Sequence, residues 1–132
     1  MEDVNICSKV LHEHGFPVPT PIDQARHCIL MEYIDAFLLQ VVYDLYLGAW
    51  LNSLFNDRRQ IAEIPSPGKL YSQLMDLIVR LAHAGLIHGD YNEFNILIHR
   101  ETGEPVMIDF PQMVSTSHEN AEWYVCFFRY EE

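Results

Sequence analysis

The stretch from Leu86 to Gln112 constrains this chain more than any other part of it. Asp90 and Asn95 lie five positions apart in it, and Asp109 ends a short apolar run. A second apolar run and a turn signal, Glu101-Thr102-Gly103, separate Asn95 from Asp109. Short apolar runs joined by a Gly-containing turn are typical of a β-hairpin. The order therefore predicts a polar loop, a hairpin, and an acidic residue at the end of its second strand.

The residue types at these positions suit phosphoryl transfer, which depends mostly on positioning and on charge neutralisation. Asp90 would orient or deprotonate the attacking hydroxyl or water. Asn95 and Asp109 would offer oxygen atoms to Mg²⁺, which prefers few protein carboxylates together with phosphate oxygens and water. Taken singly, each residue is more typical of a turn, because Asp and Asn side chains bond their own backbone. Only the combination favours a catalytic site.

The same residues resemble the protein-kinase pattern in which H-R-D-x-x-x-x-N is followed by D-F-G. The spellings in this chain are His88-Gly89-Asp90 and Asp109-Phe110-Pro111-Gln112. Together with the runs GDYNEFN and IDFPQMVSTSHENAEWY, they resemble the RIO family of atypical serine/threonine kinases, and its second subfamily in particular. The resemblance covers about residues 15–32 and 65–124.

The resemblance implies an ATP- and Mg²⁺-dependent kinase or ATPase linked to maturation of the small ribosomal subunit. A pre-ribosomal small-subunit particle would be its partner. It further implies that Asp90 and Asp109 are catalytic and that Asn95 and Asp109 bind the metal. In this family the position of Asp109 can also accept a phosphoryl group, giving an aspartyl-phosphate intermediate.

Residues 27–33, HCILMEY, are predicted to form a short buried strand. By the resemblance, this strand leads into the hinge between the two lobes of a kinase. Met31 would then be the gatekeeper, and the backbone of Glu32 and Ile34 would meet adenine. A plain core strand is the alternative, since backbone contacts leave no signature in the side chains.

Three departures from ordinary kinases carry physical information. Gly89 replaces an arginine that usually pairs with an activation-loop phosphate, so that control cannot operate. Asn92 stands where serine/threonine kinases usually carry a lysine, which predicts weaker support for transfer to a peptide hydroxyl. Pro111 fixes its φ, which predicts a less mobile Asp109-Phe110 unit. His88 is interpreted as a packed, hydrogen-bonded residue below the loop and not as a proton carrier.

Apolar spacing predicts helices over residues 1–14 and 70–83, the first ended by Gly15 and the second near Gly85. Residues 36–55 are apolar and aromatic, and a buried or amphipathic helix is the main prediction for them. A membrane span is the alternative, although Asp44 would be costly in its middle. A segment foreign to the fold is another. Residues 113–120 are predicted to form a polar loop, after which a helix or packed segment begins.

The predicted fold class is α+β: a protein-kinase-like C-terminal lobe, mostly helical with a short β-hairpin, whose upper lobe is largely missing. Residues 1–35 would be a remnant of the upper lobe and hinge, residues 36–60 an atypical apolar insertion, and residues 61–132 the C-lobe with both site loops. No glycine-rich phosphate loop precedes the hinge, and neither lysine lies on a strand before it. The chain alone is therefore expected to show little or no ATP turnover.

Composition sets further limits on partners and compartment. The net charge of −11, from 8 basic and 19 acidic residues, gives no signal for direct binding of nucleic acid. Three widely spaced cysteines without a C-x-x-C pair favour a reducing setting, and the acidic N-terminus does not resemble a signal peptide. A metal cluster of Cys7, His12 and His14 is disfavoured against an ordinary helix surface. The expected location is the cytoplasm, with nuclear shuttling open, and no membrane is expected as a partner.

Two other functions stay open at this point. The chain could be a catalytically dead kinase-like module that docks a partner through residues 36–55. It could also be a small-molecule phosphotransferase of the wider kinase-like clan, which also uses H-G-D with a downstream Asn and Asp. The DFPQ and NEFN spellings favour the RIO interpretation over the latter.

Overall fold

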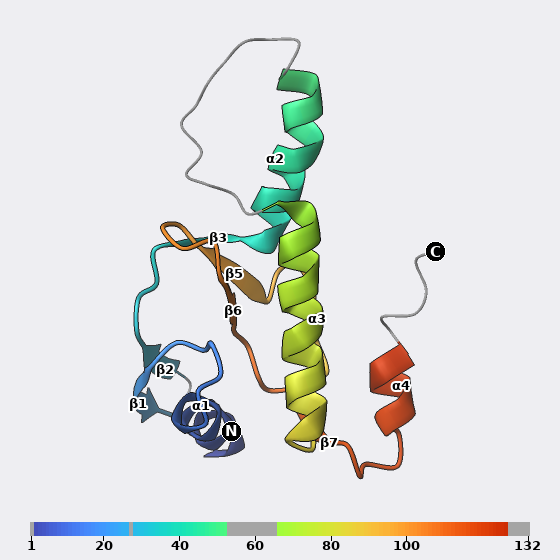
Figure 1. Ribbon diagram of the computed structural model, residues 1–132. Coiled ribbons are helices and arrows are strands. Elements are labelled where there is room, and N and C mark those ends of the chain that lie inside the picture. Colours follow the sequence, from blue (N-terminus) through green and yellow to red (C-terminus); the bar gives the residue numbers. More distant parts are fainter. Residues whose placement is uncertain (1, 27, 53–65, 127–132) are drawn as a thin grey trace.

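The computed structural model describes residues 2–26, 28–52 and 66–126, which form four helices and seven short strands (Figure 1). The helices are α1 (Glu2–Glu13), α2 (Leu39–Asn52), α3 (Pro67–His83) and α4 (Ala121–Cys126). The strands are β1 (Pro21–Ala25), β2 (Cys28–Met31), β3 (Ala36–Leu38), β4 (Leu86–Ile87), β5 (Ile96–His99), β6 (Pro105–Met107) and β7 (Val114–Ser115).

The first helix forms as its apolar spacing predicts. Leu11 is fully buried and anchors α1 to the core. Gly15 follows the helix with a φ of 73°, a left-handed conformation that glycine adopts without steric cost. The next residue closes the turn, because the Phe16 amide donates to the Leu11 carbonyl at 3.0 Å. The chain then turns into an extended proline-rich connector.

β1 and β2 pair with each other in an antiparallel hairpin. The predicted strand at residues 27–33 is thus confirmed over Cys28–Met31, and His27 lies outside the described residues. Its predicted burial is wrong: Leu30 and Met31 are 57% and 43% exposed. A two-stranded ribbon can bury its side chains only against another layer. Helix α1 packs mainly on β1, so the side chains of β2 stay largely exposed.

The centre of the molecule is an antiparallel sheet of strand order β3-β5-β6 beside the long helix α3. Alternate residues of β5, Ile96 and Ile98, are buried, as is Met107 of β6. Leu77 and Leu81 of α3 join the same core. The hairpin and the helix predicted from the sequence are confirmed, with α3 beginning three residues earlier than predicted because Ser66 caps it and Pro67 fits its first turn.

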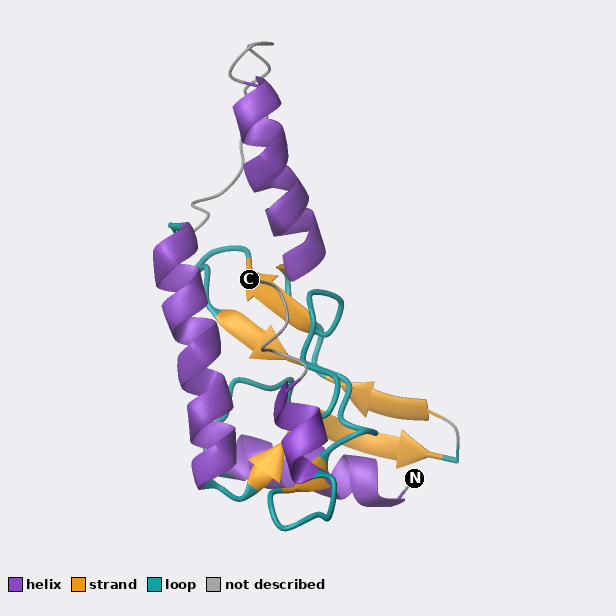
Figure 2. Ribbon diagram, turned by 90° about the vertical axis from the view of Figure 1, so that its right-hand side faces the viewer, coloured by secondary structure: helices purple, strands orange, loops and turns teal. Residues whose placement is uncertain are grey.

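The prediction of one helix over residues 36–55 is wrong for residues 36–38 and confirmed from Leu39 to Asn52, while residues 53–55 lie outside the described part of the chain. The first three residues form β3, whose backbone pairs with β5 in the register Ala36 to His99. The helix α2 begins at Leu39, and Val42 is completely buried in its first turn. Both views show α2 projecting beyond the sheet (Figures 1 and 2). In the part of the chain that is described, no helix is long and apolar enough to cross a membrane.

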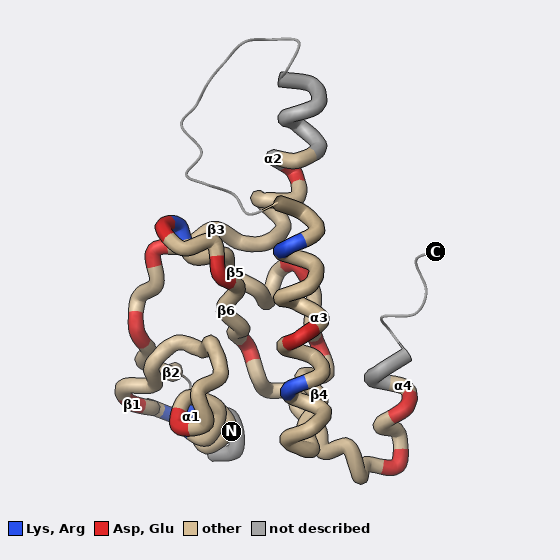
Figure 3. Tube along the Cα trace, viewed as in Figure 1, with Lys and Arg blue, Asp and Glu red and all other residues tan. Residues whose placement is uncertain are grey.

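The last described segment, from β7 to α4, lies beside β4 at the end of α3. The predicted polar loop 113–120 contains a short strand, β7, that pairs antiparallel with β4 and was not predicted. The helix predicted after it is α4. Acidic side chains occur from α1 to α4, while Lys and Arg are sparse (Figure 3). The surface charge therefore follows the acidic composition instead of being concentrated in one element.

Candidate active site

The loop between β4 and β5 is held by two amide side chains that bond one carboxylate. Asn92 Nδ2 donates to Asp90 Oδ1 at 2.8 Å, and Asn95 Nδ2 donates to Asp90 Oδ2 at 2.8 Å. Asn95 Nδ2 also donates to the Asp90 carbonyl at 2.9 Å. Both carboxylate oxygens of Asp90 are thus oriented by neutral amides, and in the described part of the chain Asp90 forms no ion pair.

Asn95 connects this loop to the end of the hairpin. The Ile108 amide donates to the Asn95 carbonyl at 3.0 Å, which places Asn95 beside the residue that precedes Asp109. Since both bonds from the Asn95 side chain come from its nitrogen, its amide oxygen is left without a hydrogen bond among the described residues. That oxygen is the kind of neutral ligand that Mg²⁺ accepts.

His88 lies beneath both loops, with 3% of its surface exposed. The Asp90 amide donates to its Nδ1 at 3.3 Å, so Nε2 carries the ring proton and donates to the Ile108 carbonyl at 3.1 Å. Burial lowers the pKa of His88, and the bond to Ile108 and the carboxylates of Asp90 and Asp109 oppose this shift. The interpretation of His88 as a packed, hydrogen-bonded residue is confirmed.

His88 also shows that the two predicted catalytic acids lie in one region. Both carboxylates are close enough to its ring to act on its charge. Phe110, which follows Asp109, packs against the same ring at a centroid distance of 5.4 Å. Tyr91, which follows Asp90, packs edge-on at 5.7 Å. One aromatic cluster therefore supports both loops.

The structure leaves no room for a side chain at position 89, a constraint that the comparison with the kinase arginine did not reveal. Its φ is 83°, and a Cβ built on it would clash with the backbone carbonyl of Gln112. The absence of a side chain lets the segment after Asp109 pass directly over the loop that carries Asp90. Sequence reasoning missed Gln112 as a neighbour, because a contact made by its backbone leaves no signal in its residue type.

Asp109 is the only non-glycine residue among those described with a positive φ, 65°. That region costs most side chains about 1–2 kcal/mol, although Asp and Asn tolerate it best. Asp109 is exposed while the next residue, Phe110, is buried. At this turn the exposed Asp109 is followed directly by the buried phenyl ring of Phe110, which anchors the segment. Such outliers are common at functional sites.

One cavity of about 590 Å³, here called the hinge cavity, is lined by residues from both the predicted hinge and the predicted metal site. The predicted hinge residues Met31, Glu32 and Ile34 line it together with Asn95 and Asp109. Asp90 does not line the cavity and reaches it through its bond to Asn95.

Residues that the sequence analysis did not assign also line the hinge cavity, among them Ser8 of α1 and the apolar Leu97, Ile108 and Phe110. Leu97 could have been found from strand alternation, because it is two positions from Asn95. No signal in the sequence marks Ser8, which arrives from a distant helix. The apolar lining gives a flat ring a surface to pack on.

The oxygen donors at the cavity fit Mg²⁺ better than a transition metal. One carboxylate and one amide oxygen form half of a site that phosphate oxygens and water would complete. The described residues contain no group of three or more His, Cys, Asp or Glu arranged to hold a metal. Cys7, His12 and His14 accordingly form no such group.

Comparison with known proteins points to one family. A family model for the RIO domain matches residues 7–126. The serine/threonine-protein kinase rio2 of Schizosaccharomyces pombe is 56% identical over 116 residues, which are 88% of this chain and 28% of that protein. The chain thus spans less than a third of the length of this relative.

Two crystal structures of the Rio2 kinase from Chaetomium thermophilum have the same arrangement. One matches with a TM-score of 0.71 at 45% identity, covering 92% of this chain and 34% of that chain. The other, an ADP/Mg²⁺-phosphoaspartate complex, has a TM-score of 0.69 at 43% identity and covers 96% and 34%. The α+β, protein-kinase-like fold is confirmed by these neighbours. The chain belongs to the RIO family of atypical serine/threonine kinases, and within it to the Rio2 type.

Proposed function

We propose that this chain is the C-terminal lobe of a Rio2-type kinase or ATPase, with part of the hinge attached. The observation that carries the proposal is the hinge cavity, where Met31, Glu32 and Ile34 meet Asn95 and Asp109. The three hinge residues are far from Asn95 and Asp109 in the sequence, and the sequence analysis assigned the two groups different roles. Their meeting in one cavity is what a nucleotide bound at one end and a metal-bound phosphate at the other requires.

The proposed division of the chain follows the predicted boundaries. Residues 1–35 would contribute the hinge side and residues 61–132 the two site loops. Residues 36–60 would be the atypical apolar insertion between them, except that residues 36–38 join the central sheet as β3; residues 53–65 lie outside the described part of the chain. In this arrangement adenine meets the backbone of Glu32 and Ile34. The Glu32 side chain does not compete for it, because its carboxylate accepts bonds from the Thr20 hydroxyl at 2.6 Å and the Thr20 amide at 3.1 Å.

Asn95 Oδ1 and the Asp109 carboxylate are the proposed ligands of Mg²⁺. When bound, the ion would neutralise charge on the phosphate oxygens. Asp90, whose two oxygens are fixed by Asn92 and Asn95, would orient the attacking hydroxyl or water. Each of its oxygens accepts one bond from a neutral amide and has a further lone pair with which it could accept a hydrogen bond from that hydroxyl or water.

Asp109 is also the proposed acceptor in a covalent transfer of the phosphoryl group. In this step its carboxylate oxygen attacks the γ-phosphorus, a new P–O bond forms, the bond to the β–γ bridging oxygen breaks, and ADP leaves. Water would then hydrolyse the aspartyl phosphate and release inorganic phosphate. The complex of the Chaetomium thermophilum relative, which contains ADP, Mg²⁺ and phosphoaspartate, supports this route.

The proposed setting is maturation of the small ribosomal subunit in the cytoplasm, with nuclear shuttling. A net charge of −11 gives the chain no electrostatic attraction to RNA phosphates. Contacts with a pre-ribosomal particle would therefore depend on protein surfaces or on regions of the relatives that this chain does not span.

A catalytically inactive binding module is the second candidate. Among the described residues that line the hinge cavity, none is Lys or Arg, so no cation there meets a triphosphate. Helix α2, whose sequence is rich in apolar residues, projects from the sheet (Figure 2) and is the element through which such a module would dock a partner.

Thermal-shift measurements with ADP, with and without MgCl₂, separate the two candidates. The enzyme-derived site predicts an increase in melting temperature that needs both ADP and Mg²⁺ and disappears in Asn95→Ala. Glu119→Gln, a change at an exposed residue that does not line the hinge cavity, is the matched control and should keep the shift. An absent shift in the unmodified chain, or a shift that survives in Asn95→Ala, contradicts the proposed site.

A further inference from the structure

Thr20, at the end of the proline-rich connector, meets Glu32 at the open end of the β1–β2 hairpin. Pro21 pairs with Met31 in the register of the hairpin, so residues 20 and 32 form the next pair. The Glu32 amide donates to the Thr20 carbonyl at 2.9 Å. In an antiparallel ladder such a pair exchanges two bonds, and the second would run from the Thr20 amide to the Glu32 carbonyl.

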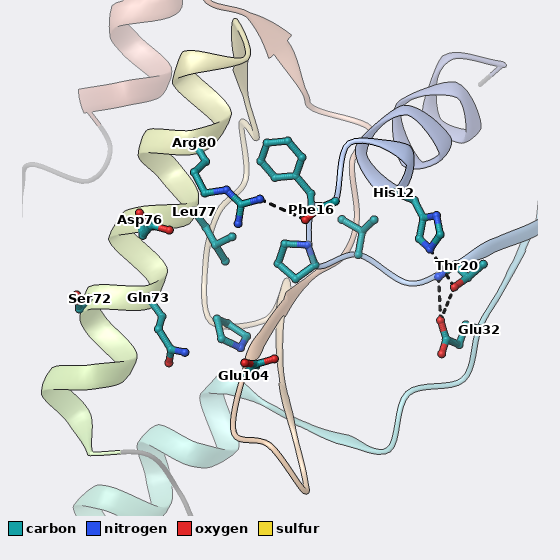
Figure 4. Close-up of a pocket in the computed structure, with 14 residues that line it drawn as sticks. His12, Phe16, Thr20, Glu32, Ser72, Gln73, Asp76, Leu77, Arg80 and Glu104 are labelled. Carbon is teal, nitrogen blue, oxygen red and sulfur yellow. Dashed lines mark hydrogen bonds between the residues drawn. The ribbon is translucent and has the colours of Figure 1, made fainter.

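The second bond of this pair goes to the side chain of Glu32 instead. The Thr20 amide donates to Glu32 Oε2 at 3.1 Å, and the Thr20 hydroxyl donates to the same oxygen at 2.6 Å (Figure 4). The Glu32 carbonyl accepts no hydrogen bond from any described residue. A side-chain oxygen has thus taken the place of a backbone carbonyl in the ladder, which leaves that carbonyl available to another donor.

Thr20 is itself held from the other side. Its hydroxyl has one proton, which goes to Glu32, so the 3.2 Å contact with His12 Nε2 is a bond that His12 donates. Figure 4 shows this chain of bonds running from α1 through Thr20 to the predicted hinge. The bonds from the hydroxyl and the amide of Thr20 lower the pKa of Glu32, as expected for a carboxylate that accepts two donors.

Glu32 lies between two cavities. Of the described residues, it is the one that lines both the hinge cavity and a second cavity of about 670 Å³ beside α3, whereas Thr20 and His12 line only the second. The carboxylate therefore lies with Thr20 on the side of the second cavity, and the backbone of Glu32 is left for the hinge cavity. Ile34 also lines the hinge cavity, and its amide donates to no described residue. This edge of the hinge cavity thus offers one backbone acceptor and one backbone donor.

We propose that Thr20 is a positioning residue for the base of the nucleotide, an inference that rests on the proposed function. Thr20 holds the Glu32 carboxylate in the ladder, so the Glu32 carbonyl stays free to accept from the exocyclic amine of adenine, while the Ile34 amide donates to a ring nitrogen. Adenine carries a donor at position 6 of the ring, whereas guanine carries an oxygen acceptor there. An acceptor opposite the Glu32 carbonyl would leave both groups without a bond, so this edge selects adenine.

NMR titrations of the 132-residue protein with ADP and with inosine diphosphate, each with MgCl₂, test the role of Thr20. The two ligands differ at position 6 of the base, where inosine diphosphate has an oxygen in place of the amine. The wild type should bind ADP about threefold to tenfold more tightly, the value of one hydrogen bond. Thr20→Val keeps the shape of the side chain without the hydroxyl, so the amide of residue 20 can return to the Glu32 carbonyl. The preference for ADP should then disappear, with the affinity for inosine diphosphate unchanged.

Matched variants separate positioning from a general effect on the fold. Thr20→Ser keeps the hydroxyl and should keep the preference for ADP. Thr116→Val makes the same chemical change as Thr20→Val at an exposed residue that lines neither cavity, and it should leave both affinities unchanged. Glu32→Ala removes the same bonds from the other side and should also abolish the preference, which keeps the test decisive if Thr20→Val does not fold. An equal loss of affinity for both ligands in Thr20→Val would show a structural role only and would overturn the proposal.

Failure of this inference is distinguishable from failure of the proposed function. A wild type that binds neither nucleotide would contradict the proposed site and the role of Thr20 together. A wild type that binds ADP through Asn95, combined with an unchanged preference for ADP in Thr20→Val and Glu32→Ala, would overturn the role of Thr20 alone. Loss of the preference in both variants, with its retention in Thr20→Ser, is the expected result.

Discussion

Gly89 is the residue on which the close approach of the two site loops depends. Replacement by alanine would add a Cβ within 2.8 Å of the Gln112 carbonyl carbon at a backbone with a φ of 83°. We expect the free energy of unfolding to fall by about 2–4 kcal/mol, since left-handed strain and overpacking add. Urea unfolding measures this change.

The matched control for that substitution is Gly68→Ala. Gly68 lies in the first turn of α3 with nothing within 4 Å of an added Cβ, so alanine should be neutral or stabilise by up to about 1 kcal/mol. Equal effects at the two glycines would mean that the contact with Gln112 does not exist.

His88 should make the fold sensitive to acid. Its pKa is lowered in the folded state by burial, so the unfolded chain binds a proton more readily below its ordinary value of about 6.5. The free energy of unfolding should therefore decrease as the pH falls below about 6.5, by up to about 1.4 kcal/mol per pH unit.

Unfolding free energies measured from pH 7.5 to 5.5 test this linkage in the wild type and in His88→Asn. The variant has no imidazole, so its dependence on pH should be shallower whatever its absolute stability. Identical slopes in the two proteins would show that His88 is not the group responsible.

At the scale of residues, the sequence points to candidate catalytic and metal-binding groups more readily than to the residues packed around them. Asp90, Asn95 and Asp109 could be selected because polar residues at fixed spacing reflect the chemistry directly. Ser8 and Gln112 could not, because one comes from a distant helix and the other makes its contact through its backbone. The roles proposed for the hinge residues also involve the backbone, so only resemblance pointed to them.

At the scale of elements, the start of α3 rests on its cap. Ser66 Oγ accepts from the Lys69 amide at 3.4 Å, a long bond at the first turn of the helix. Ser66→Ala should lower the free energy of unfolding by about 0.5–1 kcal/mol, at the weaker end for such caps. Ser72→Ala makes the same chemical change within the helix and should be neutral or slightly stabilising. Urea unfolding of both variants checks the difference, and an equal loss in Ser72→Ala would contradict the capping role.

Elements with a long repeating pattern could be predicted and the shortest ones could not. α3 carries apolar residues at helical spacing over 17 residues, and the β5–β6 hairpin has a turn signal between two apolar runs. β3 and β7 have only three and two residues, which is too short for any periodicity. Their structure comes from backbone pairing with β5 and β4, partners that are distant in the sequence.

At the scale of the whole molecule, the hinge cavity is wide and poorly enclosed. Two of the residues that line it are open to solvent: Met31 is 43% exposed and Tyr33 is 88% exposed. The cavity combines apolar walls with two metal-ligand candidates, which suits recognition of a nucleotide but supplies no cationic side chain for its phosphates. Exclusion of water and fixed charges normally supply much of the catalysis in phosphoryl transfer.

The 132-residue chain should therefore bind Mg²⁺–nucleotide weakly and turn over little or no ATP. Without a cation for the α- and β-phosphates, Mg²⁺ at Asn95 and Asp109 would be the main counter-charge, and an open cavity would leave the phosphates hydrated. A sensitive assay of phosphate release, run with Asp109→Ala in parallel, measures the difference that belongs to the site. Turnover well above that of Asp109→Ala would show that the described residues form a complete active site. Binding that needs Mg²⁺, combined with equal and negligible turnover of both proteins, is the expected result.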